Sequence, residues 1–355
     1  MFFWGLMLLV CIGLGVIERR NAQLSARVDS GCFWIFGSAM VVFAAFRPIG
    51  IARDDLAYLE IFKTVCPSME CGQWVQSTRD WGWYSLVGFI KSFCAGPRVM
   101  LLVSATAALI KLWVIFKLSR RPMLALLFFT GVFYQVQDLT AFRVSLSLAV
   151  FMLAIYLLSR RFRVIGAISV FIPGLFHQQA VLSPLILLSG LLKRRYALFV
   201  ALVLAPICLL FLGGTFKAYT EILPFQDLPL LKPIIQQGIG PYIAAGQAGA
   251  YAKTRVMPYS FLPLMLLIVC FSREVFLTNK DLYRYSAMSF VITCWLIWFF
   301  AGWEEPQARF FEYFALPAVL LVGNFRSSWL SLLGVLVVAG VFVMRYNVLH
   351  PLLTG

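Results

Sequence analysis

Charged residues are scarce in this sequence: Asp, Glu, Lys and Arg make up 13% of the 355 residues, about half the proportion found in soluble proteins. Hydrophobic residues make up 61%, and a soluble chain of this length could not hide that much apolar surface from water. These proportions exclude a soluble enzyme, a disordered chain and a secreted disulfide scaffold. The long apolar runs also differ from the polar–apolar alternation of outer-membrane barrel strands. What remains is an all-α, polytopic integral membrane protein.

Sequence motifs for bound cofactors are also missing. The chain has no nucleotide-binding glycine loop, no Walker motif, no zinc-ligand spacing and no internal repeat, and it contains only two histidines. The short loops predicted on one side leave no room for a nucleotide-binding domain. We therefore expect no cofactor and no metal, and the energy for any reaction has to come from the substrate.

Apolar stretches predict about twelve transmembrane helices, with a range of ten to fourteen, in a single transmembrane domain that covers residues 1–355. Some stretches are shorter than the roughly 20 residues that a perpendicular span needs, so they must borrow flanking residues. Segment 82–94 is interpreted as an interfacial helix, because Lys91 and its aromatic neighbours suit a headgroup region. The predicted spans are 2–17, 32–46, 98–116, 122–136, 144–158, 164–176, 180–192, 196–214, 258–271, 285–301, 310–323 and 328–344.

Lys and Arg predict the orientation of these spans. The tight basic turns at 120–121, 160–161 and 193–195 all fall on one side, as do the basic residues of the first loop, 18–31. The positive-inside rule places this side in the cytoplasm and both termini outside. The net charge of +15 is then mostly a topology signal, and we expect no nucleic-acid partner. The N-terminal segment is interpreted as a retained, reversed anchor.

Two long segments, 47–97 and 215–257, are predicted on the outer side as large loops. The first contains Cys66 and Cys71, which an oxidising compartment could bridge; two free thiols are the alternative. It also contains Asp54, Asp55 and Tyr58, which a helix starting near Asp54 would bring together on the membrane surface. Either this is a capped amphipathic helix, or one of its carboxylates acts as a base near the lipid headgroups.

The same outer loop continues with Asp80, Trp83 and Tyr84. Aromatic faces next to an acid can line a sugar site, although tryptophan and tyrosine are also common at membrane interfaces. Further along, Arg143 stands at the outer N-terminus of a predicted helix, where free N–H groups and the guanidinium together favour a phosphate. His177 lies at the outer end of a hairpin that Pro173 and Pro184 interrupt, and it is a candidate base or a structural histidine.

A fourth outer patch surrounds Arg309, which is predicted at the outer N-terminus of another helix, with Glu304 and Glu305 beside it. The alternative is interfacial anchoring by a snorkelling arginine. Together, the four patches gather basic helix starts and carboxylates on the outer side. The phosphates of a lipid-linked substrate would lie at that level.

The chain resembles the EpsG-like branch of the Wzy-type bacterial O-antigen and exopolysaccharide polymerases. The resemblance rests on the Phe46–Phe62 segment with its Asp-Asp pair, the acid–x–Gly–aromatic–Tyr run at Asp80–Tyr84, the helix from Phe142, the hairpin from Gly174 and the Ala308–Phe314 run. It extends over most of the chain. The family often carries Glu where this chain has Asp80.

This resemblance implies a multi-spanning glycosyltransferase architecture like that of C-type enzymes, in the bacterial inner membrane with its active site facing the periplasm. The substrates would be undecaprenyl-diphosphate-linked oligosaccharide repeat units, and no nucleotide sugar would be needed. Arg143 and Arg309 would stabilise the diphosphate leaving group, with Arg53 or Arg47 in support, and the base would be His177, Asp54 or Asp55. Tyr58, Asp80, Trp83, Tyr84, Glu304 and Glu305 would contact sugars. Membrane lipids and a chain-length-regulating copolymerase of the Wzz type would be its other partners.

Three other functions stay open. A glycosyltransferase that moves a single sugar from a polyprenyl phosphate would also carry acids in its first outer loop. An O-antigen ligase would use a similar set of arginine and histidine. A flippase or transporter would be expected to show repeated halves and ionisable residues at mid-membrane. The chain has no such repeat, and its most evident charge within a span, Lys111, lies toward the inner end of its helix and is expected to snorkel to the nearer membrane surface.

Overall fold

The computed structural model describes residues 2–50, 54–64, 80–93, 96–160, 162–192, 195–211, 269, 272–273, 275–277, 279–300 and 304–324. These residues form helices and turns, and no strand occurs among them. The predicted all-α class is therefore confirmed for this part of the chain.

The helices follow the apolar stretches closely. The first half contains α1 (Phe2–Arg20), α2 (Ala22–Phe46), α3 (Asp55–Thr64), α5 (Trp81–Phe93), α6 (Val99–Leu118), α7 (Pro122–Phe129), the π-helix η1 (Thr130–Tyr134) and α8 (Gln135–Gln137). The second half contains α9 (Phe142–Ser159), α10 (Arg163–Ser169), α11 (Pro173–Phe176), the 3₁₀-helix η2 (Gln178–Leu192), α12 (Tyr196–Phe211), α16 (Lys280–Phe299), α17 (Glu304–Phe314) and α18 (Ala318–Val322).

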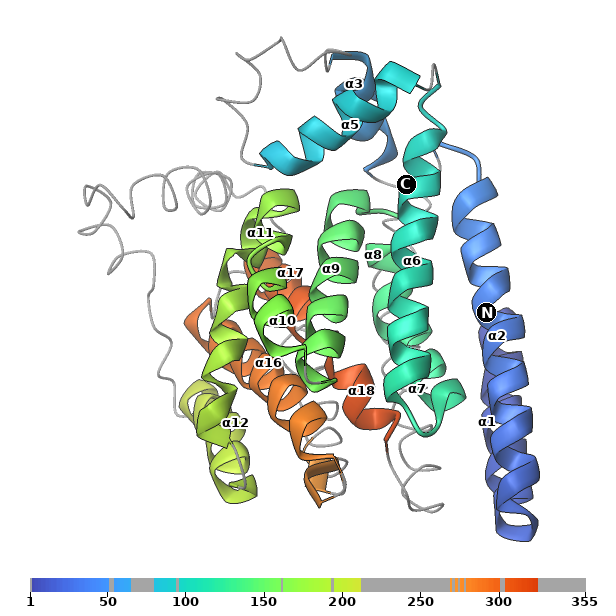
Figure 1. Cartoon of the computed structure of the whole chain (residues 1–355), viewed down its shortest axis with the longest axis vertical. Coiled ribbons are helices and arrows are strands. Elements are labelled where there is room, and N and C mark those ends of the chain that lie inside the picture. Colours follow the sequence, from blue (N-terminus) through green and yellow to red (C-terminus); the bar gives the residue numbers. More distant parts are fainter. Residues whose placement is uncertain are drawn as a thin grey trace.

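Helices α6 and α9 pack side by side and run in the same direction (Figure 1). Ser104 and Lys111 of α6 contact Asp138 and Ser145 in that order, and Arg160 beyond the end of α9 reaches the carbonyl of Lys117. The segment α7–η1–α8 connects them and leads the chain back along the bundle. As a result α9 begins at the same end of the bundle as α6.

Helices α3 and α5 lie across this end of the bundle (Figure 1), as expected of helices that follow a membrane surface. They are held there by a buried cluster that includes Tyr58 and Phe62 of α3, Trp83 of α5, Met100 of α6 and Phe142 of α9. Tyr58 stacks on Phe142 at a ring-centroid distance of 4.6 Å. We call this the α3–α5 end.

Basic turns lie at the opposite end. The Arg121 backbone N–H donates to the Gly323 carbonyl, and the Asn324 side chain donates to the Leu118 carbonyl, so the turn between α6 and α7 is bound to the end of α18. Arg121 also pairs with Glu18 at the end of α1. The separation of basic turns from the α3–α5 end agrees with the sequence pattern.

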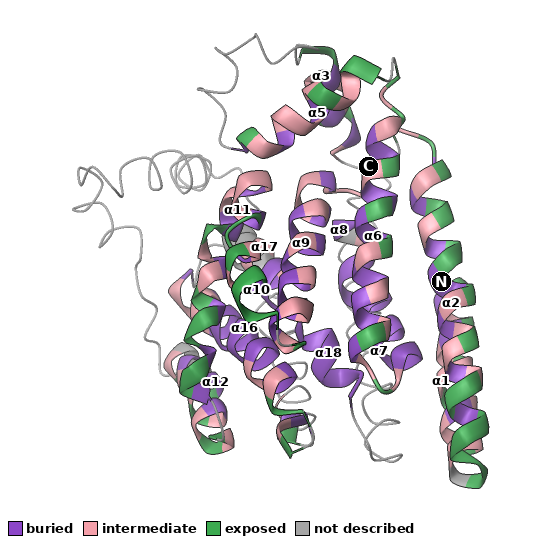
Figure 2. Cartoon of the chain, viewed as in Figure 1, coloured by how far each residue is buried: buried purple, intermediate pink, exposed green. Residues whose placement is uncertain are grey.

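Among the helices that the structure describes, three are long and apolar enough to cross a membrane: α2, α6 and α9. Apolar side chains are exposed on outward faces (Figure 2), for example Ile35 of α2 at 70% and Val164 of α10 at 74%. Such surfaces are costly in water and suit lipid. The count of twelve spans and the placement of both termini stay predictions.

Two details of the sequence interpretation are wrong. The loop predicted at 18–31 is reduced to a tight turn at Asn21, whose side chain accepts a hydrogen bond from the Leu24 N–H and so begins α2 at Ala22. The second concerns Lys111, which was expected to extend toward the nearer membrane surface.

Lys111 is instead fully buried and forms an ion pair with Asp138 at 2.5 Å. Ser145 of α9 accepts a hydrogen bond from Lys111 at 3.2 Å and donates one to Asp138. Ser104 of α6 donates to the Asp138 carbonyl at 2.6 Å. This buried polar network binds α6 to the turn from which α9 starts.

Candidate functional site

Asp80, just before α5, bridges two other elements at the α3–α5 end. Its Oδ2 accepts a hydrogen bond from Arg143 Nη1 at 2.6 Å, and its Oδ1 accepts one from the Gln178 backbone N–H at 2.9 Å. The Asp80 side chain is 6% exposed, whereas that of Arg143 is 32% exposed. Asp80 therefore orients an arginine that remains accessible along one edge.

Arg143 is the second residue of α9, so the prediction that it stands at a helix N-terminus is confirmed. Its Cζ lies 5.9 Å from the centre of the Tyr58 ring, and its backbone N–H points to the Tyr58 hydroxyl at 3.4 Å. Arg143 Nε makes no hydrogen bond within the described part of the chain. Since this Nε is buried, the donor capacity that the guanidinium keeps for an anion is on its accessible edge, while Asp80 fixes its position.

Gly82 sets the distance between α5 and the hairpin that carries His177. A Cβ added at Gly82 would lie 2.7 Å from the Leu175 carbonyl oxygen and 2.9 Å from the Leu175 Cβ. Both atoms belong to or adjoin the backbone of α11, so a side chain here would push the two elements apart. Glycine in the Trp-Gly-Trp sequence therefore allows Asp80 to reach Gln178.

His177 is an extended residue between α11 and η2, with φ −151° and ψ 123°. Its side chain is 5% exposed, and its Nε2 lies 3.0 Å from Gln179 Oε1. Its Nδ1 is buried and has no hydrogen-bond partner among the described residues. Burial lowers the pKa of His177 to about 4, while the nearby Asp80 carboxylate opposes the shift. The imidazole is therefore neutral near pH 7.

Tyr313 of α17 packs behind His177, with ring centroids 6.2 Å apart. The Tyr313 hydroxyl is 2.9 Å from Ser147 Oγ, which donates to the Pro173 carbonyl. Helices α9, α11 and α17 are thereby joined directly behind the imidazole. We call Tyr58, Asp80, Arg143, His177 and Gln179 the Asp80–Arg143 cluster.

Arg309 is half-buried on α17 and lies close enough to His177 for its positive charge to help lower the pKa of that imidazole. Its predicted position at a helix N-terminus is wrong, because α17 begins at Glu304 and Arg309 is in the second turn. The helix dipole therefore adds little at Arg309. The side chains of Glu304 and Glu305 are outside what the structure describes.

Asp55 is the first residue of α3 and forms a bidentate ion pair with Arg47. Arg47 Nη1 and Nη2 each donate to one carboxylate oxygen at 2.6 Å, and the Gly50 N–H donates to Oδ2 at 2.8 Å. Gly50 has a φ of +104°, which favours glycine. Asp55, expected as a base, and Arg47, expected to support the diphosphate site, are thus paired with each other in a buried turn. The neighbouring Asp54 is half-buried.

The aromatic sugar candidates differ in accessibility. Trp83 has no exposed surface, and Tyr58 is 3% exposed, so neither offers a free ring face in this conformation. Burial also raises the pKa of the Tyr58 hydroxyl. Tyr84 is half-buried and Trp81 is 46% exposed. Trp81 is the most accessible aromatic side chain of the Asp80–Tyr84 run.

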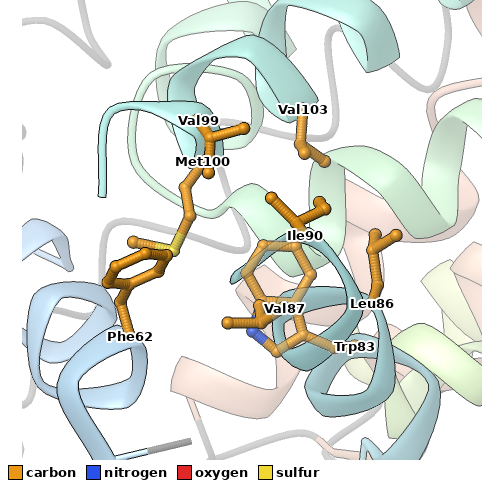
Figure 3. A pocket seen from close by; sticks show the side chains of 8 residues that line it. All are labelled: Phe62, Trp83, Leu86, Val87, Ile90, Val99, Met100 and Val103. Carbon is orange, nitrogen blue, oxygen red and sulfur yellow. The ribbon is translucent and has the colours of Figure 1, made fainter. Parts of the chain in front are cut away.

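A small crevice next to Trp83 is lined by aliphatic and aromatic side chains, and the indole nitrogen of Trp83 is their one nitrogen or oxygen atom (Figure 3). Phe62 of α3, Trp83 and Val87 of α5 and Met100 of α6 contribute to its walls. A single indole N–H is too little to orient a sugar or a phosphate. We interpret it as the seam where α3 and α5 pack on α6.

Several predicted features lie outside the described residues: Arg53, the Cys66–Cys71 pair and the second large loop, 215–257. Among the described residues, no group of three His, Cys, Asp or Glu side chains is placed to hold a metal ion. Sequence reasoning missed the contributions of Gln179, Gly82 and Tyr313. Gly82 and Tyr313 do lie in two of the runs on which the family resemblance rests, Asp80–Tyr84 and Ala308–Phe314, but sequence reasoning gave neither of them a role.

Comparison with known proteins gives one family match. The family model described as the EpsG family matches residues 32–350. No curated protein and no solved structure matches the chain. Since the family match covers most of its length, the protein belongs to the EpsG family.

Proposed function

We propose that the protein is a membrane glycosyltransferase that joins undecaprenyl-diphosphate-linked oligosaccharide repeat units on the periplasmic face of the bacterial inner membrane. Membership of the EpsG family supports a polysaccharide polymerase-type role in general. The observation that carries the specific proposal is the placement of Arg143. It stands at a helix N-terminus, is oriented by Asp80 and lies beside a buried neutral histidine.

This arrangement suits the transfer of a glycosyl group from a lipid diphosphate. A hydroxyl of the acceptor sugar attacks the anomeric carbon of the donor, and the bond from that carbon to the diphosphate oxygen breaks. The electron pair leaves with the diphosphate, whose growing negative charge needs fixed positive charge nearby. Arg143, the N–H groups at the start of α9, and Arg309 would provide it.

The acceptor hydroxyl loses its proton in this step, and a neutral histidine can take it. We assign this role to His177 rather than to Asp55, because both oxygens of Asp55 already accept hydrogen bonds from Arg47. Asp54 is the remaining alternative. Asp80 is assigned to orienting Arg143, since a direct sugar contact would cost it one of its two partners.

A Wzz-type copolymerase would set the length of the product.

Reconstitution tests this proposal directly. The purified protein in lipid vesicles receives its natural lipid-linked repeat units and no nucleotide sugar, and the products are separated on a gel. We expect a ladder from the wild type, its loss in Arg143→Ala, and partial retention in Arg143→Lys, which keeps the charge but not the fork. Arg163→Ala removes an exposed arginine at the start of α10 and is the matched control.

The products also distinguish the alternatives. Addition of a single sugar from a polyprenyl phosphate would identify a different glycosyltransferase. Transfer of one finished chain to a lipid acceptor, without a ladder, would identify a ligase. A folded wild-type protein that makes no ladder from natural units would refute the polymerase proposal.

A further inference from the structure

The contact between His177 and Gln179 determines which imidazole nitrogen carries the proton. Gln179 Oε1 is a carbonyl oxygen and has no hydrogen to donate, so the 3.0 Å contact is a hydrogen bond only if His177 Nε2 carries a hydrogen. A neutral imidazole carries one N–H hydrogen. His177 Nδ1 is then unprotonated, with its lone pair free.

The surroundings of His177 are consistent with this state. Nδ1 is buried without a partner among the described residues, and a buried polar atom without a hydrogen bond is costly and uncommon. Arg143 and Arg309 both place positive charge near the ring, Asp80 places negative charge there, and the Tyr313 ring packs behind it. Burial is the main reason that the ring stays neutral; the two cations add to this effect and the Asp80 carboxylate opposes it.

We infer that Gln179 is a positioning residue that holds His177 as the Nε2–H tautomer, so that Nδ1 is the atom that accepts the proton of the acceptor hydroxyl. This inference rests on the proposed function and deepens it. As the new bond from oxygen to the anomeric carbon forms, the proton passes to Nδ1 and His177 becomes an imidazolium. The pair of electrons from the broken bond stays on the departing diphosphate, so atoms and charge balance.

Gln179 itself never touches the reacting atoms in this scheme. Its side chain is 7% exposed, and it acts only through Nε2. His177 Nδ1 is buried, so the acceptor has to open the site on binding. Once His177 is protonated, Gln179 Oε1 still accepts from Nε2, so the same contact stabilises the imidazolium that forms.

Nitrogen-15 NMR of the full-length protein in lipid measures the tautomer directly. Only two histidines are present, so labelling the imidazole nitrogens gives two sets of signals, and a His350→Asn variant identifies those of His177. We expect the wild type near pH 7 to show Nε2 protonated and Nδ1 unprotonated. A spectrum with Nδ1 protonated would overturn the inference.

Three variants separate positioning from a general structural role. Gln179→Leu removes the acceptor, and we expect signals from the Nδ1–H tautomer and a loss of kcat of about a hundredfold, the scale of general-base catalysis, with little change in KM. Gln179→Glu keeps an acceptor oxygen and should retain Nε2–H. Its negative charge should move the acid limb of the pH–rate profile to higher pH. Gln178→Leu is the matched control for the spectrum, because only the backbone of Gln178 contacts Asp80.

A wild-type spectrum of the Nε2–H form that Gln179→Leu leaves unchanged would also overturn the inference, since Gln179 would not determine the tautomer. Full activity of Gln179→Leu in a protein whose spectrum shows the Nδ1–H tautomer would overturn it as well. Failure of the proposed function is distinguishable from both. In that case the spectra behave as expected but the folded wild type makes no ladder, so the tautomer assignment stands and the role of Nδ1 as base fails.

Discussion

Asp80 holds Arg143 through one carboxylate oxygen and the backbone of Gln178 through the other. This places a surface helix, α5, in direct contact with the start of α9 and with the residue that follows His177. The two parts of the site that the proposed reaction needs, an anion-binding arginine and a proton acceptor, thus share one carboxylate. A change at Asp80 should therefore affect both.

Asp80→Asn tests this relationship. The variant keeps an acceptor for the Gln178 N–H but removes the negative charge opposite Arg143, which should cost about 2 kcal/mol of stability, as for a hydrogen bond to a charged group. Polymer formation should fall more than tenfold, because Arg143 is no longer held. Asp80→Glu keeps the charge and should preserve most of the activity. The free energy of unfolding in detergent and the polymer yield measure the two effects. Equal yields from Asp80→Asn and the wild type would contradict the positioning role.

Gly82→Ala tests the close approach of α5 to α11. The added methyl would meet Leu175 at distances under 3.0 Å, so we expect about 1–3 kcal/mol of destabilisation from overpacking and a loss of activity as Asp80 moves away. Gly31→Ala in α2 is the control, because a Cβ there meets nothing within 4 Å and alanine favours the helix. Thermal unfolding and the polymer assay should separate the two variants. Unchanged activity in Gly82→Ala would mean that the close approach of α5 to α11 is not needed for activity.

Sequence patterns predicted the helices better than the contacts between them. The apolar runs gave α6 and α9 to within a few residues, and the position of Arg143 at a helix start followed from where the run 144–158 begins. The bond between Asp80 and Arg143 joins residues 63 positions apart. No local periodicity specifies which residue on another helix will face a given side chain, so this pairing could not be predicted.

Asp54 and Asp55 provide a natural comparison, because adjacent acids have different surroundings. Asp55→Asn would leave the buried Arg47 charge without its bidentate partner, and we expect about 3 kcal/mol of destabilisation. Asp54→Asn should leave stability within about 0.5 kcal/mol of the wild type, as for a surface change. Thermal unfolding gives both values. Should Asp54→Asn abolish the ladder while stability is kept, the role of base would move from His177 to Asp54.

Lys111 shows why a charge in an apolar run is hard to interpret from sequence alone. An unpaired lysine would extend to the surface, but Asp138, in the turn before the parallel helix α9, pairs with Lys111. Lys111→Met should therefore cost about 3–5 kcal/mol, because it leaves a buried carboxylate without its cation. The double variant Lys111→Met/Asp138→Asn should recover much of that loss. Unfolding in detergent provides the double-mutant cycle, and strictly additive effects would contradict the pairing.

The pH dependence of stability should report the burial of His177. Its pKa is lowered from an ordinary 6.5 to about 4 by burial, so between these values the unfolded chain binds a proton that the folded protein does not. Stability should therefore be unaffected by this group above about pH 6.5 and should fall as the pH decreases toward 4, where the difference levels off. His177→Gln removes the titrating group and should flatten this part of the curve. The free energy of unfolding, measured at intervals across this range, checks the sign. Stability that rises on acidification through the same window in the wild type, but not in His177→Gln, would show that the histidine is protonated in the folded state.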